Sequence, residues 1–445
     1  ILRRYPITLL TIGNQLFKSG MRERFWRAVG LVRKIIEDPK GPVGRELARI
    51  KGELELTMFF TEFNDIPKMS EYHRKAYAYL KELSDPPRSI LFSGAMPSWT
   101  LGVPSVLFLY WRNSGELDKT LSIMDECLPI YARLTSGHGS GGEHIMRAEA
   151  CLNRGDDAGA EALCYKAFYD ARSAGQAGNC ICASLVMARA AIMRGDAKAY
   201  ETARRSITEE AAGARQKAAS HMGELAAALL DMTLGRAADL PDWLRDMESI
   251  RNVLYIIGQP YAFALYGMML LAERRCTELY AVTELVMSVS RGLNFLLPQV
   301  YHLIYLAAAK HIDGFDKEAA DCIKDALALA MPDKIYLPFA EHGYAILPML
   351  ESLRGDFDAE RIDTLAGVCH RQISGAAAVR KALFGVSSPL THRQREIALR
   401  TREGLSAKEI AAKLFISENT VKSAQKIIYD KLNIHTKIEL TKIEF

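Results

Sequence analysis

The chain lacks the short motifs that carry most enzyme chemistry. It contains no Gly-Lys dipeptide, and therefore no Walker A loop for nucleoside triphosphates. It also lacks a nucleophile elbow, a His-Glu-x-x-His pair and the His/Cys spacing of zinc deaminases. These absences predict that the chain is not an enzyme, with no catalytic residue and no cofactor.

The chain also lacks metal-binding cysteine motifs and long apolar runs. The eight cysteines include no Cys-x-x-Cys pair and no metal-ligand spacing with histidine, which predicts no metal site and buried thiols in a reduced, cytoplasmic setting. The longest apolar stretch, 261–272, is far shorter than the roughly 20 residues that a bilayer needs. We therefore expect no membrane partner.

Most of the chain instead repeats a pattern of about 40 residues. Glycines recur at 115, 155, 195 and 235, Arg275 takes the next slot, and Gly314 and Gly355 continue the series within one residue. Each glycine stands between apolar, Ala-rich segments and is followed by an acidic residue in several repeats, which is typical of a left-handed helix end before a new N-cap. The pattern predicts an all-α, TPR-like solenoid of helical hairpins over residues 1–384.

The last 56 residues, 390–445, have a different character. Hydroxyl and Glu/Gln side chains three residues apart predict capped helix starts at Thr391, Ser406 and Thr436, and Ser417 supplies a fourth N-cap. The connection between the second and third helices is too short for anything but a tight turn. This layout predicts a helix-turn-helix after a linker at 385–389.

The third of these helices is expected to span about 418–432 and to have two distinct faces. Its inward positions are apolar: Val421, Ala424, Ile428 and Leu432. Its opposite face carries the polar residues Asn419, Lys422, Ser423, Lys426 and Asp430. Lysines can contact phosphates or guanine, and Asn and Ser can reach base edges, although a basic helical face is more often merely solvated.

The whole segment resembles the DNA-binding domain of LuxR-type transcriptional regulators. The resemblance rests on a long series of matches, among them Gly404-Leu405-Ser406, Lys408-Glu409-Ile410-Ala411, Thr420-Val421-Lys422 and Lys431-Leu432. It implies that Lys422, Ser423 and Lys426 read the major groove of double-stranded DNA, and that Thr420 and Lys408 lie near phosphates. The predicted DNA-binding set is Lys408, Ser417, Asn419, Thr420, Lys422, Ser423, Gln425 and Lys426.

Three residues depart from the family pattern. Ala424 replaces a usual histidine and removes a polar group beside the DNA, Ile427 replaces a polar residue, and Phe415 stands where glycine is common. Sigma-factor region 4 shares part of the core motif, but a fourth capped helix from Lys437 favours the LuxR pattern. That helix is short, so we expect at most a weak homodimer on DNA.

Charge agrees with a nucleic-acid partner. From Val386 onward the chain has eleven Lys and Arg against seven Asp and Glu, a net charge of +4 that equals the net charge of the whole chain. The body before it is electrically balanced. A polyanion is therefore attracted to the C-terminal segment.

A helical array before such a domain resembles the MalT-like class of large regulators. Segments such as 63–66 and 338–341 are similar to that class, which normally also has an N-terminal NTPase module. Because the chain begins at Ile1 without an initiator Met, we expect it to be the C-terminal part of a longer regulator. The resemblance implies a small-molecule inducer or protein partner in the groove of the body, with RNA polymerase as a further partner.

Two features of the body leave alternatives open. The Gly-rich loop 137–142, followed by Glu143 and His144, could cradle an anion or could simply connect two helices; the adjacent Glu143 and His144 are expected to point apart, against a metal site. Aromatic groups are expected to be mostly core, with one or two facing a ligand groove. The competing function is a protein-interaction scaffold whose C-terminal segment serves assembly.

Overall fold

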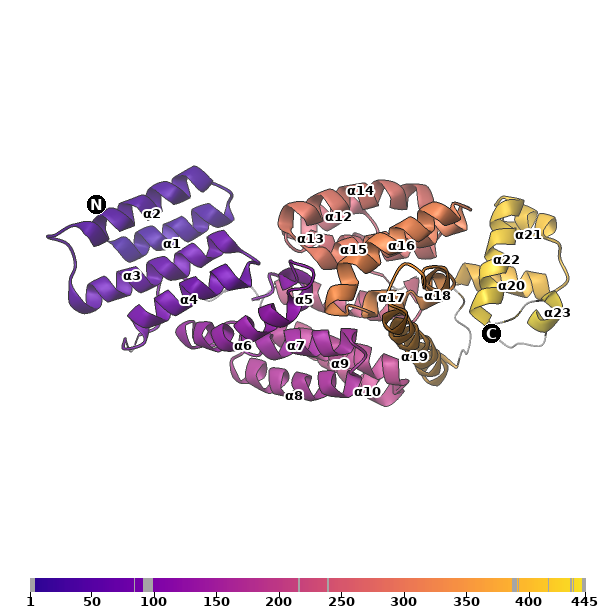
Figure 1. The fold of residues 1–445 in the computed structure, drawn as a ribbon, viewed down its shortest axis with the longest axis horizontal. Coiled ribbons are helices and arrows are strands. Elements are labelled where there is room, and N and C mark those ends of the chain that lie inside the picture. Colours follow the sequence, from indigo (N-terminus) through magenta and orange to yellow (C-terminus); the bar gives the residue numbers. More distant parts are fainter. Residues whose placement is uncertain are drawn as a thin grey trace.

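The computed structural model describes residues 5–83, 85–90, 99–214, 217–237, 240–385, 390, 392–414, 416–432, 434 and 436–441. Every regular element within these ranges is a helix (Figure 1). The predicted all-α class is confirmed for this part of the chain.

The N-terminal helices form a small unit with its own apolar core. They stand at the indigo end of the molecule in Figure 1. Phe25, Val32 and Ile50 are fully buried in this core. The elements are α1 (Pro6–Lys18), α2 (Arg22–Glu37), α3 (Gly44–Met58), η2 (Phe59–Glu62) and α4 (Ile66–Leu80).

The central helices follow in pairs; from α6 to α11 each helix packs against the next one along the chain, and α5 packs against α7. Their contacts depend on small side chains: α8 buries Ala160, Cys164 and Ala167, which lets neighbouring helices approach closely. The elements are α5 (Val106–Tyr110), α6 (Leu117–Leu134), α7 (Gly142–Asn153), α8 (Asp157–Ser173), α9 (Ala177–Arg194), α10 (Ala197–Gly213) and α11 (Lys217–Thr233).

The chain then continues less regularly. Where the spacing predicts a full helix after Gly235, the described residues form one 3-10 turn and a short helix. The elements are η4 (Asp242–Leu244), α12 (Met247–Val253), α13 (Gln259–Ala272), α14 (Cys276–Leu293), α15 (Leu296–Ile312), α16 (Asp316–Ala330), η5 (Met331–Asp333), α17 (Leu337–Glu341), α18 (Gly343–Ser352) and α19 (Ala359–Phe384).

The turns between these helices show the predicted chemistry at several positions. Gly155 and Gly195 have φ of 82° and 76°, and the Asp156 and Asp196 carboxylates accept hydrogen bonds from Gly159 and Ala199 amides to cap the next helices. Glycine tolerates this left-handed conformation because it has no Cβ.

Two positions in the predicted glycine series are wrong. The left-handed residue of the fifth turn is Arg274, with φ of 60°, and not Arg275, which instead precedes α14 as its N-cap residue. Gly355 is not left-handed, because the following helix starts later, with Asp358 as its cap.

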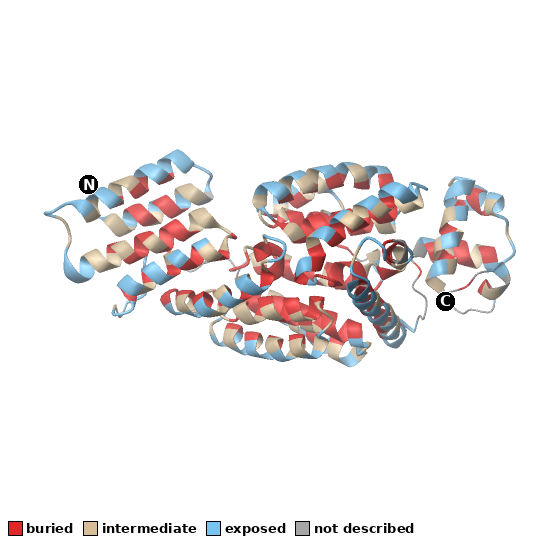
Figure 2. Cartoon of the chain, in the orientation of Figure 1, coloured by how far each residue is buried: buried red, intermediate tan, exposed pale blue. Residues whose placement is uncertain are grey.

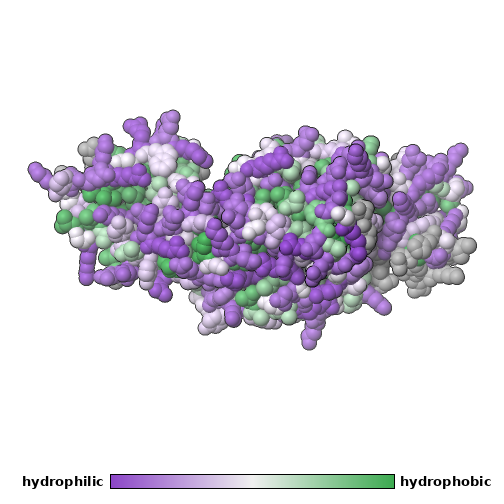
Figure 3. Space-filling model, viewed as in Figure 1, coloured by the Kyte–Doolittle hydropathy of each residue, from purple (hydrophilic) through white to green (hydrophobic). Residues whose placement is uncertain are grey.

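One continuous apolar core joins the helices from α4 to α19, and Figure 2 shows its buried residues in red along their inner faces. Six of the eight cysteines are buried and all are free thiols, as predicted. No helix of the described residues is long and apolar enough to cross a bilayer. Hydrophilic side chains dominate the face drawn in Figure 3.

Most of the aromatic groups belong to the core, as expected. Tyr110, Trp111, Phe263 and Tyr305 are almost completely buried. Among the exposed aromatic groups are Tyr165 and Tyr169 on α8, together with Tyr255 and Phe315.

Candidate DNA-binding domain

Four short helices at the C-terminus pack around an apolar core of their own. Ile397, Ile410, Val421 and Ile428 are buried in it. The helices are α20 (His392–Arg402), α21 (Ala407–Leu414), α22 (Glu418–Leu432) and α23 (Lys437–Leu440). The span of α22 is the one predicted from its sequence.

The helix starts are held by the predicted caps. Ser406 and Glu409 form a reciprocal capping box, in which each backbone amide donates to the other side chain at 2.8 and 3.3 Å. The Ser417 hydroxyl accepts from the Thr420 amide at 3.0 Å, and Thr436 caps Glu439 in the same way. Thr391 lies outside the described residues.

The turn before α22 places that helix across the other two. α22 packs against both α20 and α21, so its inward face is fixed by the core residues. Val421, Ala424 and Ile428 point inward, as predicted, and Leu432 is partly buried. Phe415, which stands where glycine is common in the family, lies outside the described residues.

Polar and basic side chains cover the outer face of α22 and the N-terminal ends of α21 and α22. Asn419, Thr420, Lys422 and Lys426 are exposed, as are Ser417 and Lys408. Lys422 forms a surface ion pair with Glu418, N to O 2.8 Å. Exposed pairs of this kind contribute little stability, so a phosphate can compete for the lysine.

Two residues of the predicted set are engaged inside the protein. The Gln425 side-chain amide donates to the Thr401 hydroxyl at 2.9 Å and so ties α22 to α20. Ser423 is half-buried, and its backbone oxygen accepts a hydrogen bond from Arg274 in the body at 3.2 Å.

Comparison with known families agrees with this geometry. Residues 388–443 match the family described as bacterial regulatory proteins, luxR family. The C-terminal domain is a LuxR-type helix-turn-helix domain. The match supports a DNA-binding regulator of transcription. No curated protein matches the chain.

The structure explains two of the departures from the family pattern, at Ala424 and Ile427, by where these side chains pack. Ala424 is 2% exposed and belongs to the domain core, so the expectation that it alters the surface beside the DNA is wrong. Ile427 is half-buried and faces the body, where it lines a cavity. Its apolar side chain suits that contact.

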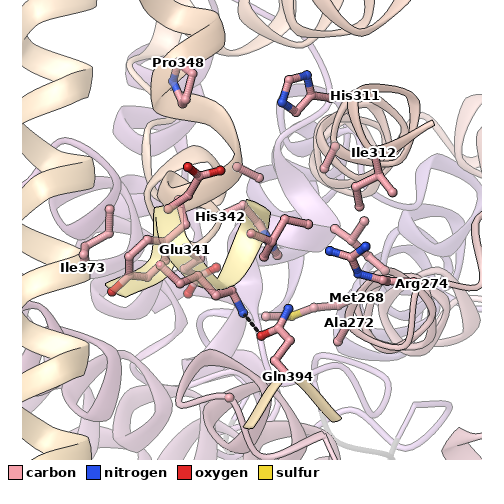
Figure 4. A pocket seen from close by; sticks show the side chains of 18 of the residues that line it. Met268, Ala272, Arg274, His311, Ile312, Glu341, His342, Pro348, Ile373 and Gln394 are labelled. Carbon is pink, nitrogen blue, oxygen red and sulfur yellow. Dashed lines mark hydrogen bonds between the residues drawn. The ribbon is translucent and has the colours of Figure 1, made fainter. Parts of the chain in front are cut away.

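The LuxR-type domain lies against one end of the body, beside α16 and α18 in Figure 1. A cavity of about 440 Å³ separates them, and Figure 4 shows Arg274 of the body and Gln394 of the domain on its wall. Ser423, Lys426, Ile427, Asp430 and Lys431 contribute one side of α22 to the lining. Two of the predicted groove-reading residues, Ser423 and Lys426, therefore face the body.

Lys431 occupies the positively charged part of this cavity. Its ammonium donates a hydrogen bond of 2.8 Å to the Gln394 side-chain oxygen. Burial, with repulsion from Arg380 and Arg274, lowers the pKa of Lys431 to about 7. Burial also lowers the pKa of Arg274 and of Arg380.

Sequence reasoning missed this group of cations. Arg274, Arg380 and Lys431 are separated by large stretches of chain, and only Lys431 belongs to a motif. The available signal was Arg380, a charged residue on a helix face that otherwise carries apolar residues such as Ala376 and Val379.

The Gly-rich loop 137–142 is explained by close packing. A Cβ at Gly141 would lie 2.5 Å from the Ala167 backbone oxygen, and one at Gly142 would lie 2.6 Å from the Trp99 ring. Both contacts are too short for any other residue, which favours the connecting role of the loop.

The side chains that follow this loop do come together. One ligand atom each of Glu143, His144 and Asp170 lies within 4.8 Å of the others, so the expectation that Glu143 and His144 point apart is wrong. The His144 ring nitrogen lies 3.7 Å from the Asp170 carboxylate.

Proposed function

We propose that the chain is a transcriptional regulator in which a TPR-like helical-repeat body receives a signal and the LuxR-type domain inserts α22 into the major groove of promoter DNA. The proposed body spans residues 1–384, and the domain spans 390–445 after a short linker. The signal is a small molecule or a protein partner. The protein acts in the cytoplasm as a regulator of the MalT-like class, and RNA polymerase is a further partner.

The outer face of α22 presents polar and basic side chains that suit DNA. Asn419, Thr420, Lys422 and Lys426 are exposed together on one capped helix of a LuxR-type domain. Helix-turn-helix domains place such a helix in the major groove, where lysines contact phosphates or guanine and Asn contacts adenine. Ser417 and Lys408 flank this face and are placed to contact the phosphate backbone. Ser423 and Gln425 complete the proposed set when α22 leaves the body and the Gln425 amide exchanges the Thr401 hydroxyl for DNA.

Two copies of the LuxR-type domain are expected to associate only weakly. α23 has four residues, Lys437–Leu440, and offers a small surface for a second copy. We propose a weak homodimer that forms on DNA, where two half-sites hold the domains together.

Selection from a pool of random duplexes tests the proposal. The full chain is expected to enrich fragments that share one sequence motif, because base contacts from Asn419, Lys422 and Lys426 discriminate among sequences by about 1–3 kcal/mol per base pair. Recovered fragments with no shared motif would contradict promoter recognition.

The second candidate is a protein-interaction scaffold. It is favoured by the hydrogen bond from Arg274 of the body to the Ser423 backbone oxygen, which engages α22 with protein. A scaffold would bind duplexes without sequence preference or not at all, so the same selection separates the two functions.

A further inference from the structure

The cavity between the body and α22 combines an apolar wall with a charged one. Its apolar wall comes from the C-terminal ends of α13 and α15 and from the middle of α19, and includes Met268, Ile312 and Ile373 (Figure 4). Leu271 of α13 belongs to the same wall. At about 440 Å³ it falls within the range of about 300–1,000 Å³ that is typical of small-molecule sites.

The charged wall carries an excess of cations. Arg274 and Arg380 come from the body, and Lys426 and Lys431 come from α22. Arg380 is 7% exposed, and its Nε and Nη2 atoms are buried without a hydrogen-bond partner. A buried guanidinium with two unmatched donors is costly unless an acceptor reaches it.

The acidic residues of the lining are mostly committed elsewhere. Glu341 accepts from Arg189 and Tyr301 at 3.0 and 2.9 Å. Asp316 pairs with His311 at 2.6 Å. Asp430 remains as an exposed carboxylate on α22. One such carboxylate does not balance four cations.

Helix ends supply little further negative charge. α11, α13 and α15 end at the cavity, and helix C-termini carry a partial negative charge. Their last carbonyls, however, already accept hydrogen bonds from turn amides, among them those of Gly235, Arg274 and Gly314.

We propose that this cavity is the binding site for a small organic anion, a carboxylate or a phosphate with an apolar body. The anionic head lies between Arg380, Arg274 and Lys431, and the apolar part packs on Met268, Leu271 and Ile312. This inference rests on the proposed function, because it places the signal of the regulator in a definite site.

The position of the site determines its effect on DNA binding. An anion held by the body and by α22 together stabilises their contact, and this contact covers Ser423 and part of the face that includes Lys426. DNA must displace the same contact to reach that face. The anion therefore weakens DNA binding, and DNA weakens anion binding by the same factor.

Calorimetric titration of the full chain with three probes that share an octyl-length chain tests the site. Octanoate or octyl phosphate is expected to bind, and octanol to bind about tenfold more weakly or less, because it cannot pair with the guanidinium groups. The two anions distinguish a carboxylate from a phosphate ligand.

Variants connect the binding to the named residues. Arg380→Met and Arg274→Met are each expected to reduce affinity for the preferred anion about tenfold. Arg205→Met, which removes an exposed arginine on α10, is the matched control and should bind as the wild type does. Circular dichroism checks that Arg380→Met folds; if it does not, the half-exposed Arg274 provides the decisive variant.

Three outcomes would overturn the site: no binding heat with either anion, octanol binding as tightly as the anions, or unchanged affinity in the folded arginine variants. Duplex binding is measured in parallel with and without the anion, and the anion should weaken it in the wild type but not in Arg380→Met. Anion binding without duplex binding would support the anion site but refute the proposed function. Duplex binding without anion binding would support the proposed function but refute the anion site.

Discussion

The Arg274 guanidinium, in the body, donates a hydrogen bond of 3.2 Å to the backbone oxygen of Ser423 on α22. This bond joins a left-handed turn of the helical array to the helix that carries the DNA-binding face. A single side of α22 cannot lie against the body and in a DNA groove together. The two arrangements therefore compete, and changes in the body are expected to alter DNA affinity.

Ala272→Arg is expected to raise DNA affinity several-fold. Ala272 lines the cavity, and another cation there adds to the repulsion among Arg274, Arg380 and Lys431, which releases the domain from the body. Fluorescence anisotropy with a selected duplex measures the change. Ala158→Arg adds the same charge at an exposed position of α8 and is the control; equal affinities of the two variants would count against the competition.

DNA binding is expected to weaken several-fold between pH 7 and pH 9. Burial in the docked arrangement, with repulsion from Arg380 and Arg274 of the body, lowers the pKa of Lys431 from 10.5 to about 7, so the protonated lysine opposes docking. This opposition is complete below pH 7 and is lost as the pH rises toward 10.5. Docking therefore strengthens with rising pH, and docking excludes DNA.

Lys431→Met separates this effect from other titrations. Among the described residues, the unpaired charges that line the cavity with Lys431 belong to Arg274, Arg380, Lys426 and Asp430. The other two carboxylates of the lining are paired, Glu341 with Arg189 and Asp316 with His311. His342 stays neutral because burial lowers its pKa to about 4. The variant should bind DNA with little change over the same pH range. A pH profile as steep as that of the wild type would refute the role of Lys431.

Arg189→Met is expected to destabilise the body by about 3–5 kcal/mol, because it leaves the Glu341 carboxylate buried without its partner. Urea unfolding of the full chain measures the loss. The double variant Arg189→Met, Glu341→Gln removes the stranded charge and should recover most of the stability. If it recovers none, the arginine contributes through packing and not through the ion pair.

Local features of the fold could be predicted from the sequence. The Ser406–Glu409 capping box, the span of α22 and the left-handed Gly155 and Gly195 each depend on residues a few positions apart, where backbone sterics and side-chain caps act directly. The irregular helices after Gly235 could not be predicted in this way, because they depend on how distant helices pack.

The residues that line the cavity could not be predicted from the sequence either. Arg274 and Arg380 approach α22 because the array brings the ends of α13 and α19 to the LuxR-type domain, and no spacing in the sequence encodes that meeting. Ile427 was visible as an apolar residue in a polar pattern, but its reason lies in the body it faces. The positions of Glu143, His144 and Asp170 likewise depend on neighbouring helices.

The salt dependence of duplex binding tests whether α22 contacts DNA through its lysines. Replacing Lys422 and Lys426 with Ala is expected to weaken binding and to lower the slope of log affinity against log salt by about 2, since each lost phosphate contact lowers it by about 1. Lys166→Ala with Lys198→Ala removes the same charge from exposed positions of the body and should leave the slope unchanged. An unchanged slope in the Lys422, Lys426 variant would contradict the account.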